Sequence, residues 1–231
     1  MNKNPIIVYD FETTGINPHQ CYPTQLAAVA VDPRTLEIYE GGTFNSLIQV
    51  TKEQMDPLDQ KDLNRALKMT HKTREELYVA PGPKVVFTEF AAFCNRYNPS
   101  KKPRESPILC GHNILNFDNI ILHRYCKEYD MLNAEGNIKF ISNRHYDTLD
   151  DWYWWTDNLP DFGRHSADFL RLYTGMSSEG AHDAFFDVMC CYEWFRFFMM
   201  KRRRITDPSL PTKNPRGNVF KDVFKQSADV Q

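Results

Sequence analysis

The sequence predicts an α/β fold in which a mixed β-sheet is flanked by helices. Three β-rich segments, residues 6–9, 25–31 and 43–50, precede the first convincing helical pattern. Later, the short apolar segment Ile108–Cys110 leads into a second helical pattern. Strands followed by strand–helix alternation are typical of a sheet with helices packed on its faces.

The first three predicted strands are expected to form a meander, because Asp32-Pro33-Arg34 is a turn signal between the second and the third. Pro81-Gly82-Pro83 then breaks the chain, and apolar residues at helical spacing continue to Tyr97. The longest helix candidate spans 183–204. It is apolar nearly all round, so we expect most of it to be buried.

The chain has 231 residues, which fits one large domain. We expect this domain to span residues 1–204. Residues 205–231 are rich in proline and polar side chains and are expected to form an extended tail. Within it, 219–225 has the apolar spacing of a short helix, which packs either on the domain or on a partner.

Charge and cysteine usage limit the classes of function. The net charge of −2 argues against broad electrostatic binding of duplex nucleic acid, although metal ions and backbone amides can also hold phosphates. The six cysteines show no CxxC spacing, which indicates reduced, packed thiols and no zinc site. No signal peptide or membrane-spanning run is evident, so we expect a soluble cytoplasmic protein.

Four acidic residues and one histidine stand in mainly apolar surroundings: Asp10, Glu12, Asp118, His182 and Asp187. A buried unpaired carboxylate is costly, and several that converge repel one another unless cations neutralise them. All-oxygen sites suit Mg²⁺ or Mn²⁺. The pattern therefore favours a two-metal site of the kind that cleaves phosphodiesters.

Asp10 and Glu12 are two residues apart on the first predicted strand, so both point to one face of the sheet. The turn that follows, Thr13-Thr14-Gly15, presents backbone amides and hydroxyls suited to a terminal sugar hydroxyl or a phosphate. The alternative is an edge strand whose two carboxylates are simply solvated.

Asp118 lies in the segment G-H-N-I-L-N-F-D, which we expect to be helical from Asn113 onward. A carboxylate in this setting either faces a polar cleft or caps another group. Asn113 is a candidate cap for the helix, and Gly111 would let the chain approach a ligand closely. His112 is expected to be a packed, hydrogen-bonded histidine.

His182 and Asp187 lie on either side of the predicted start of the long helix. Gly180-Ala181 ends a loop, so His182 should precede the helix while Asp187 lies about one turn inside it. Because histidine titrates near neutral pH, His182 is a candidate general base. Asp183 is better explained as a carboxylate favoured by the helix N-terminus.

Together these residues resemble the DEDDh 3′→5′ exonucleases, the DnaQ-like group of the RNase H-like fold. That family has D-x-E, an Asp in a mid-chain helix, and H-x₄-D, in this order. This chain has Asp10-Phe11-Glu12, Asp118 and His182 with Asp187, over roughly residues 5–200. The segments N-I-L-N-F-D and P-T-Q-L-A-A-V-A-V-D look most like the nuclease domain of bacterial exonuclease I.

The resemblance implies two Mg²⁺ ions, for which Mn²⁺ can substitute. It implies that Asp10 bridges both ions, that Glu12 and Asp187 bind the ion that activates water, and that Asp118 positions the other. His182 would be the general base, and the products would be nucleoside 5′-monophosphates. For substrate contacts we expect Thr13, Thr14 and Asn113.

Other features have two explanations each. The run W-Y-W-W at 152–155 either stacks on bases or packs a helix against the sheet. The basic run 201–204 either binds the phosphate backbone or complements a helix C-terminus. Asp147, Asp150 and Asp151 are expected to mark a helix start.

Three functions compete. The first is a metal-dependent 3′→5′ exonuclease on single-stranded DNA, which we expect to act distributively because the extra domains of exonuclease I are not present in this sequence. The second is a 3′→5′ exoribonuclease, since RNA-trimming relatives share the same five residues. The third is an inactive binding module, but such modules usually lose a metal carboxylate, and here all four are present.

Overall fold

The computed structural model of the protein describes residues 4–98, 100–157, 159 and 162–203. Its sheet has the strand order β3-β2-β1-β4-β5. β1 is antiparallel to β2 and parallel to β4, so the sheet is mixed, as predicted. The strands are β1 (Ile6–Thr13), β2 (Pro23–Val31), β3 (Ile38–Leu47), β4 (Ile108–Gly111) and β5 (His145–Asp147).

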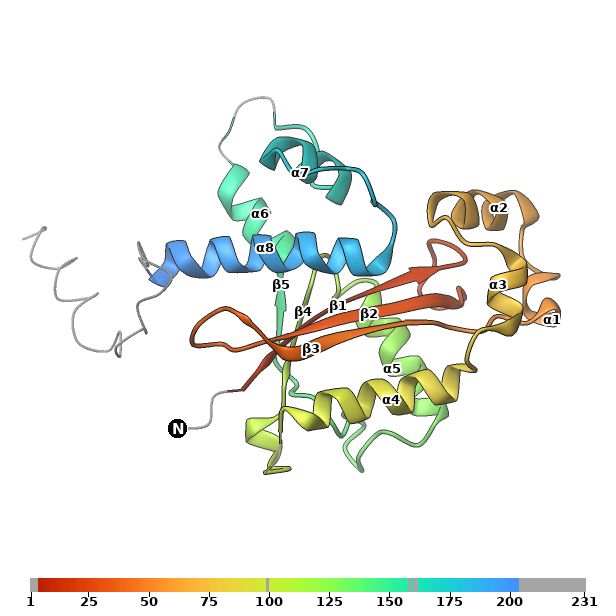
Figure 1. Ribbon diagram of the computed structural model, residues 1–231, viewed down its shortest axis with the longest axis horizontal. Coiled ribbons are helices and arrows are strands. Elements are labelled where there is room, and N and C mark those ends of the chain that lie inside the picture. Colours follow the sequence, from red (N-terminus) through yellow and green to blue (C-terminus); the bar gives the residue numbers. More distant parts are fainter. Residues whose placement is uncertain (1–3, 99, 158, 160–161, 204–231) are drawn as a thin grey trace, which may run out of the picture.

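Helices cover both faces of the sheet. The long helix α8 lies along one face, and α4 and α5 lie on the other (Figure 1). A short 3-10 helix, Pro103–Glu105, precedes β4. The helices are α1 (Lys52–Met55), α2 (Gln60–Met69), α3 (Arg74–Val79), α4 (Pro83–Arg96), α5 (Asp118–Glu128), α6 (Thr148–Thr156), α7 (Ala167–Thr174) and α8 (Ala184–Arg203).

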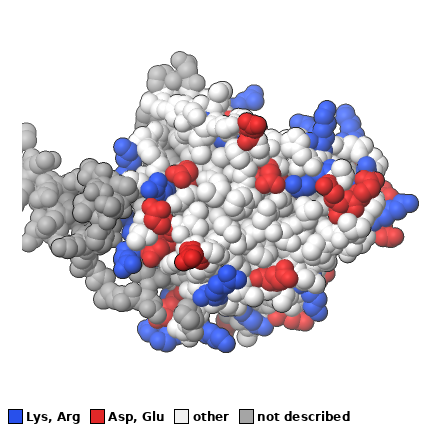
Figure 2. Space-filling model, in the orientation of Figure 1, with Lys and Arg blue, Asp and Glu red and all other residues white. Residues whose placement is uncertain are grey.

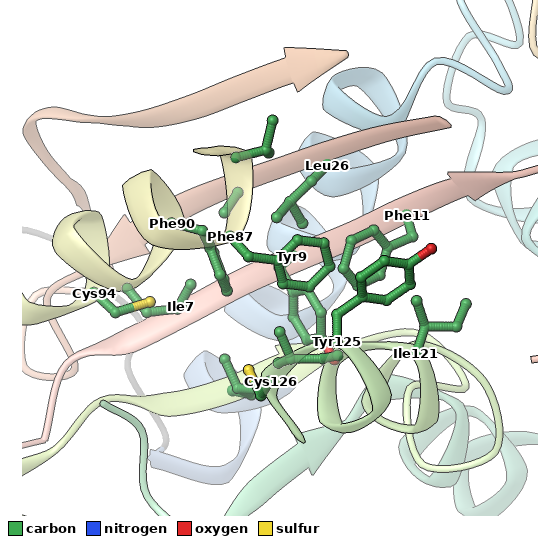
Figure 3. Close-up of a cluster of buried hydrophobic side chains, with 14 of the residues drawn as sticks. Ile7, Tyr9, Phe11, Leu26, Phe87, Phe90, Cys94, Ile121, Tyr125 and Cys126 are labelled. Carbon is green, nitrogen blue, oxygen red and sulfur yellow. The ribbon is translucent and has the colours of Figure 1, made fainter. Parts of the chain in front are cut away.

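The alternation of side chains along β1 divides the core into two layers. Tyr9 and Phe11 point toward α4 and α5, where Phe11 stacks on Phe87 with ring centroids 5.9 Å apart (Figure 3). Val8 points to the opposite face and packs in the cluster that contains Val188 of α8. Since side chains alternate along a strand, Asp10 and Glu12 must share the α8 face.

The structure corrects the expected start of α5, which begins at Asp118 and not at Asn113. Asn113 has a left-handed φ of 63°, which is incompatible with an α-helix. Asp147 accepts the backbone N–H groups of Asn113 and Leu115 and so holds this segment as a turn. Asn113 therefore does not cap α5.

Besides the 3-10 helix, five elements were absent from the sequence prediction: α1, α2, α3, α7 and β5. The helices α1 and α2 are mostly polar, and in α2 only Leu63 and Leu67 are buried. β5 has three residues and pairs with β4 along one edge. Asp147, the last residue of β5, also caps α6 by accepting the N–H of Leu149, so the predicted helix start is confirmed there.

All six cysteines are buried free thiols, as expected. No helix in the described part of the chain is both long enough and apolar enough to span a bilayer. The predicted tail, 205–231 with its segment 219–225, and the domain boundary at 204 lie outside the described residues.

Candidate metal centre and active site

β1 and α8 bring three carboxylates together. Asp10 and Glu12 project from the end of β1, and Asp187 projects from the first turn of α8. One oxygen from each of the three lies within 4.8 Å of the others. Residues separated by about 175 positions in the sequence thus form one cluster on the α8 face of the sheet.

The start of α8 is fixed by Asp183, as the sequence indicated. Its side chain accepts the N–H groups of Phe185 and Phe186, which satisfies two of the unpaired donors of the helix N-terminus. The same carboxylate accepts hydrogen bonds from Gln25 of β2 and Lys72. Asp183 is therefore a structural cap that ties α8 to the sheet, and Asp187 follows one turn later.

Asp118 lies beside β1, close to the cluster. It is the first residue of α5, is 3% exposed, and accepts the backbone N–H of Phe11 at 3.1 Å. It does not belong to the group whose oxygens lie within 4.8 Å of one another. Its charge nevertheless raises the pKa of Asp10, so it shares the electrostatic field of the site.

The carboxylates disfavour their ionised forms in the absence of cations. Burial, followed by the charge of Asp187, raises the pKa of Glu12 to about 8. Burial also raises the pKa of Asp118 to about 7, against the effect of its backbone hydrogen bonds. The pKa of Asp10 is raised well above its ordinary value by burial and then by Asp118. Such shifts are expected where carboxylates are buried and like charges lie close together.

His182 lies just before α8, as predicted, with a left-handed φ of 66°. Its backbone N–H donates to Asp187 Oδ2 at 3.2 Å, which links the loop to the carboxylate cluster. Its imidazole is about one-third exposed, and Nε2 lies 3.6 Å from Asp168 Oδ1. His182 also lines the neighbouring cavity, together with Glu12.

This cavity has a volume of about 560 Å³ and lies between the end of β1 and α2. Its size is in the range of small-molecule sites. Leu63, Ala66 and Met69 of α2 supply part of an apolar wall, and Phe117 supplies another part. Because Glu12 belongs to the carboxylate cluster and lines the cavity together with His182, the cavity adjoins the cluster.

Of the three residues predicted to contact substrate, two line the cavity and one does not. Thr13 and Thr14 line the cavity, but the hydroxyl of Thr13 donates to Gly15 O and that of Thr14 accepts the N–H of Tyr22. Asn113 is not among the described residues that line it. Their contacts with substrate remain predictions.

Two cationic side chains near the carboxylates were not predicted from the sequence. Lys72 follows α2, pairs with Asp183 at 3.3 Å, and lowers the pKa of Glu12. Arg171 of α7 is 1% exposed and pairs with Asp187 at 2.6 Å. A cation inside an apolar helical segment, F-L-R-L-Y in the case of Arg171, is the signal that could have revealed it.

The remaining polar and aromatic features have mainly structural roles. His112 is held between Thr148 and the carbonyl of His165, each at 3.0 Å, and burial lowers its pKa, so it is packed as expected. Trp152 is buried against Trp194, whereas Trp154 is 82% exposed. The aromatic run therefore serves packing at one position and is open to solvent at others.

The basic run ends α8, and Arg202 has partners on neighbouring elements. Arg202 pairs with Asp151 and donates to the hydroxyl of Tyr146. Lys201 lies over the ring of Phe197 at 5.5 Å. Both positions occupy the last turn of the helix, where cations are favoured. Arg204 is outside the described residues.

Comparison with known proteins identifies one family. The profile of the RNase T family, described as an exonuclease, matches residues 7–195. No curated protein matches the sequence.

Solved structures of exonuclease I share the fold. One, reported with a proposal for how processivity is achieved, matches with a TM-score of 0.64 over 87% of this chain and 41% of its own, at 19% identity. E. coli exonuclease I in complex with a dT13 oligonucleotide matches with a TM-score of 0.64 over 88% and 42%, at 19% identity. A zinc-bound E. coli complex with single-stranded DNA matches with a TM-score of 0.62 over 88% and 42%, at 19% identity. This chain thus spans less than half the length of these proteins.

Proposed function

This chain belongs to the RNase T family of DnaQ-like 3′→5′ exonucleases, and from that premise we propose that it removes nucleotides from the 3′ end of single-stranded DNA with the help of two divalent cations. The observation that carries the proposal is the approach of Asp10, Glu12 and Asp187 to within 4.8 Å, beside a cavity of about 560 Å³.

The residues present fit a divalent cation of the magnesium type. The donors are carboxylate oxygens, which Mg²⁺ and Mn²⁺ prefer, and no cysteine or histidine joins the group among the described residues. Burial and then neighbouring carboxylates raise the pKa values of Glu12 and Asp10, which supports a site where bound cations would favour the ionised forms. Asp10, Glu12 and Asp187 would hold the ions, and Asp118 would add its charge from beside Asp10.

When bound, the cations would supply charge stabilisation at the phosphate and at the departing 3′-oxygen. The chain's own groups have the other tasks. Asp10 and Glu12 are fixed by β1, and Asp187 is fixed by α8, so the ligands are held in place before substrate arrives. His182, which lines the cavity and is about one-third exposed, would take a proton from the attacking water.

The cavity beside the site supports recognition of a strand terminus. Its apolar wall on α2 and at Phe117 suits a nucleobase, while Glu12 and the Thr13-Thr14 turn, which also line it, would face the sugar and phosphate. A duplex end has to unpair before it can enter, which costs roughly 1–2 kcal/mol per nucleotide in lost stacking. Single strands should therefore be preferred.

Substrate class is tested with 5′-labelled DNA and RNA of matched sequence, each as a single strand and as a blunt duplex. The proposal expects the DNA single strand to be degraded fastest, and the blunt duplexes more slowly than their single strands. Faster degradation of the RNA strand would replace the proposal with the exoribonuclease alternative. With enzyme below substrate, strands that shorten in step would indicate distributive action, whereas missing intermediates would indicate processive action.

A further inference from the structure

Four residues form a closed ring beside the carboxylate cluster. Arg171 Nη1 lies 2.6 Å from Asp187 Oδ1, and Arg171 Nη2 pairs with Asp168. Asp168 Oδ1 lies 3.6 Å from His182 Nε2, and the His182 N–H returns to Asp187 Oδ2. The ring joins α7, α8 and the loop between them, and it contains both the candidate base and a candidate metal ligand.

Arg171 is the only member of the ring whose side chain is fully enclosed, with 1% exposure against 61% for Asp168. Its guanidinium lies 6.0 Å from the ring of Phe186. Its Nε has no hydrogen-bond partner among the described residues. Burying a cation in this way is costly, and an apolar side chain of similar volume often serves stability as well or better. A purely structural role therefore does not account for the choice of arginine.

The loop that carries His182 leaves little freedom for alternative arrangements. Gly180 has a φ of 98°, and a Cβ at this position would lie 2.9 Å from the ring of Phe186. His182 itself has a left-handed backbone, a conformation that costs free energy for a non-glycine residue. The contacts of His182 with Asp187 and Asp168 stabilise this backbone conformation.

Resting on the proposed function, we propose that Arg171 is a positioning residue, which orients the metal ligand Asp187 directly and the base His182 through Asp168. A planar guanidinium can bridge two carboxylates in fixed directions, which a lysine ammonium cannot do. The same guanidinium also competes with a divalent cation for the charge of Asp187. Arg171 therefore improves catalytic geometry at the expense of metal affinity.

The variant Arg171→Met keeps the side-chain volume and removes the charge. It should therefore raise the affinity for metal and lower the catalytic rate. We expect Mn²⁺ to bind several-fold more tightly in calorimetry without nucleic acid. At saturating Mn²⁺, kcat should fall roughly 10–100-fold, the usual result of misplaced catalytic groups. KM for the oligonucleotide should not change. A structural support would instead lose metal affinity and activity together.

Asp168→Ala separates the effect of Arg171 on His182, which passes through Asp168, from its direct effect on Asp187. Because Asp168 is 61% exposed, its loss should not impair folding. It should lower kcat while leaving Mn²⁺ affinity unchanged, since Arg171 still holds Asp187. Arg196→Met is the matched control: Arg196 is on α8, pairs with Glu37 at 3.2 Å, and lies outside the ring. It should leave both quantities unchanged.

Normal kcat in Asp168→Ala and Arg171→Met would overturn the inference, as would weaker Mn²⁺ binding in Arg171→Met. If Arg171→Met does not fold, the kcat of Asp168→Ala decides alone. These results are distinct from failure of the proposed function, which would show as a wild-type protein that binds Mn²⁺ yet hydrolyses no nucleic acid.

Discussion

The buried carboxylates differ in how the protein compensates their charge. Asp10 is surrounded by other acidic groups, with Asp118 the strongest neighbour, whereas Asp187 is paired with the buried Arg171. Removal of either carboxylate is expected to end catalysis, because each is a proposed metal ligand. The consequences for stability should differ.

In the metal-free protein, Asp10→Ala should preserve or raise the free energy of unfolding, because the change relieves repulsion. Asp187→Ala should lower it, since Arg171 loses a partner. The loss should stay below the roughly 3–5 kcal/mol typical of a broken buried pair, because Asp168 still pairs with Arg171. Chemical denaturation in EDTA, with a nuclease assay in Mg²⁺, checks both. A folded Asp187→Ala protein with normal activity would contradict the proposed metal site.

His182 is expected to affect the chemical step and not affinity. His182→Ala should lower kcat by roughly 10²–10⁴, the usual contribution of a general base, with little change in KM. His145→Ala is a suitable control, since His145 is exposed at the edge strand β5. If only KM rises in His182→Ala, the imidazole contacts substrate and another group accepts the proton.

At the scale of elements, β1 and α8 could be predicted because each combines an apolar run with a recognisable acidic motif, at the end of β1 and at the start of α8. β1 is apolar and buried through its first four residues, and α8 is apolar through most of 20 residues. The helix α2 could not be predicted, because its burial depends on a small cluster with residues outside the helix such as Val50 and Leu77. Asn113 was expected to start a helix, but contacts from Asp147, 34 positions away, override that local preference.

The candidate site also contains residues that could be predicted from the sequence and residues that could not. Its carboxylates and His182 were visible in the sequence, since each stands out against apolar neighbours. Lys72, Arg171 and the wall contributed by α2 were not, because their proximity to the site arises only from the packing of α2, α7 and the loop before α8. Local sequence therefore points to the candidate reactive groups, and tertiary packing determines what surrounds them.

The wall on α2 gives a test of the cavity's role. Ala66 lines the cavity, so Ala66→Trp should fill it and raise KM for a single strand while leaving the carboxylates in place. Asn64→Trp is the matched control, because Asn64 is exposed on the same helix and does not line the cavity. Steady-state kinetics of both variants decide the point. Equal KM values in Ala66→Trp and wild type would show that the terminal nucleotide binds elsewhere.

At the scale of the whole molecule, charge is mixed and not concentrated. On the face in Figure 2, lysine and arginine side chains alternate with acidic ones around a broad uncharged area. With a net charge of −2, the surface offers little general attraction for a polyanion. Binding should therefore depend on the strand terminus and on cations in the site.

The acidic cluster should make the metal-free protein less stable at higher pH. Unfolded carboxyl groups titrate near pH 4, but in the fold burial raises the pKa of Glu12 to about 8 and that of Asp118 to about 7. Between these values the folded state binds more protons than the unfolded state, so this contribution to stability falls as pH rises from about 4 to about 8.

Thermal unfolding in EDTA at pH 5.5 and pH 8 measures this effect, and Glu12→Gln should reduce the difference. Glu89→Gln, on the exposed side of α4, should not. Mg²⁺ at pH 8 should restore stability, because it favours the ionised carboxylates. An equal pH dependence in Glu12→Gln and wild type would show that the site does not govern it.

The most direct test of the proposed function follows a 5′-labelled single-stranded DNA through time, with wild type and Asp10→Asn, in Mg²⁺ and in EDTA. For wild type in Mg²⁺ we expect labelled strands that shorten one nucleotide at a time from the 3′ end, with nucleoside 5′-monophosphates as the unlabelled product. EDTA and Asp10→Asn should each stop the reaction. Early release of the labelled 5′ nucleotide, or undiminished hydrolysis in EDTA, would contradict metal-dependent cleavage from the 3′ end.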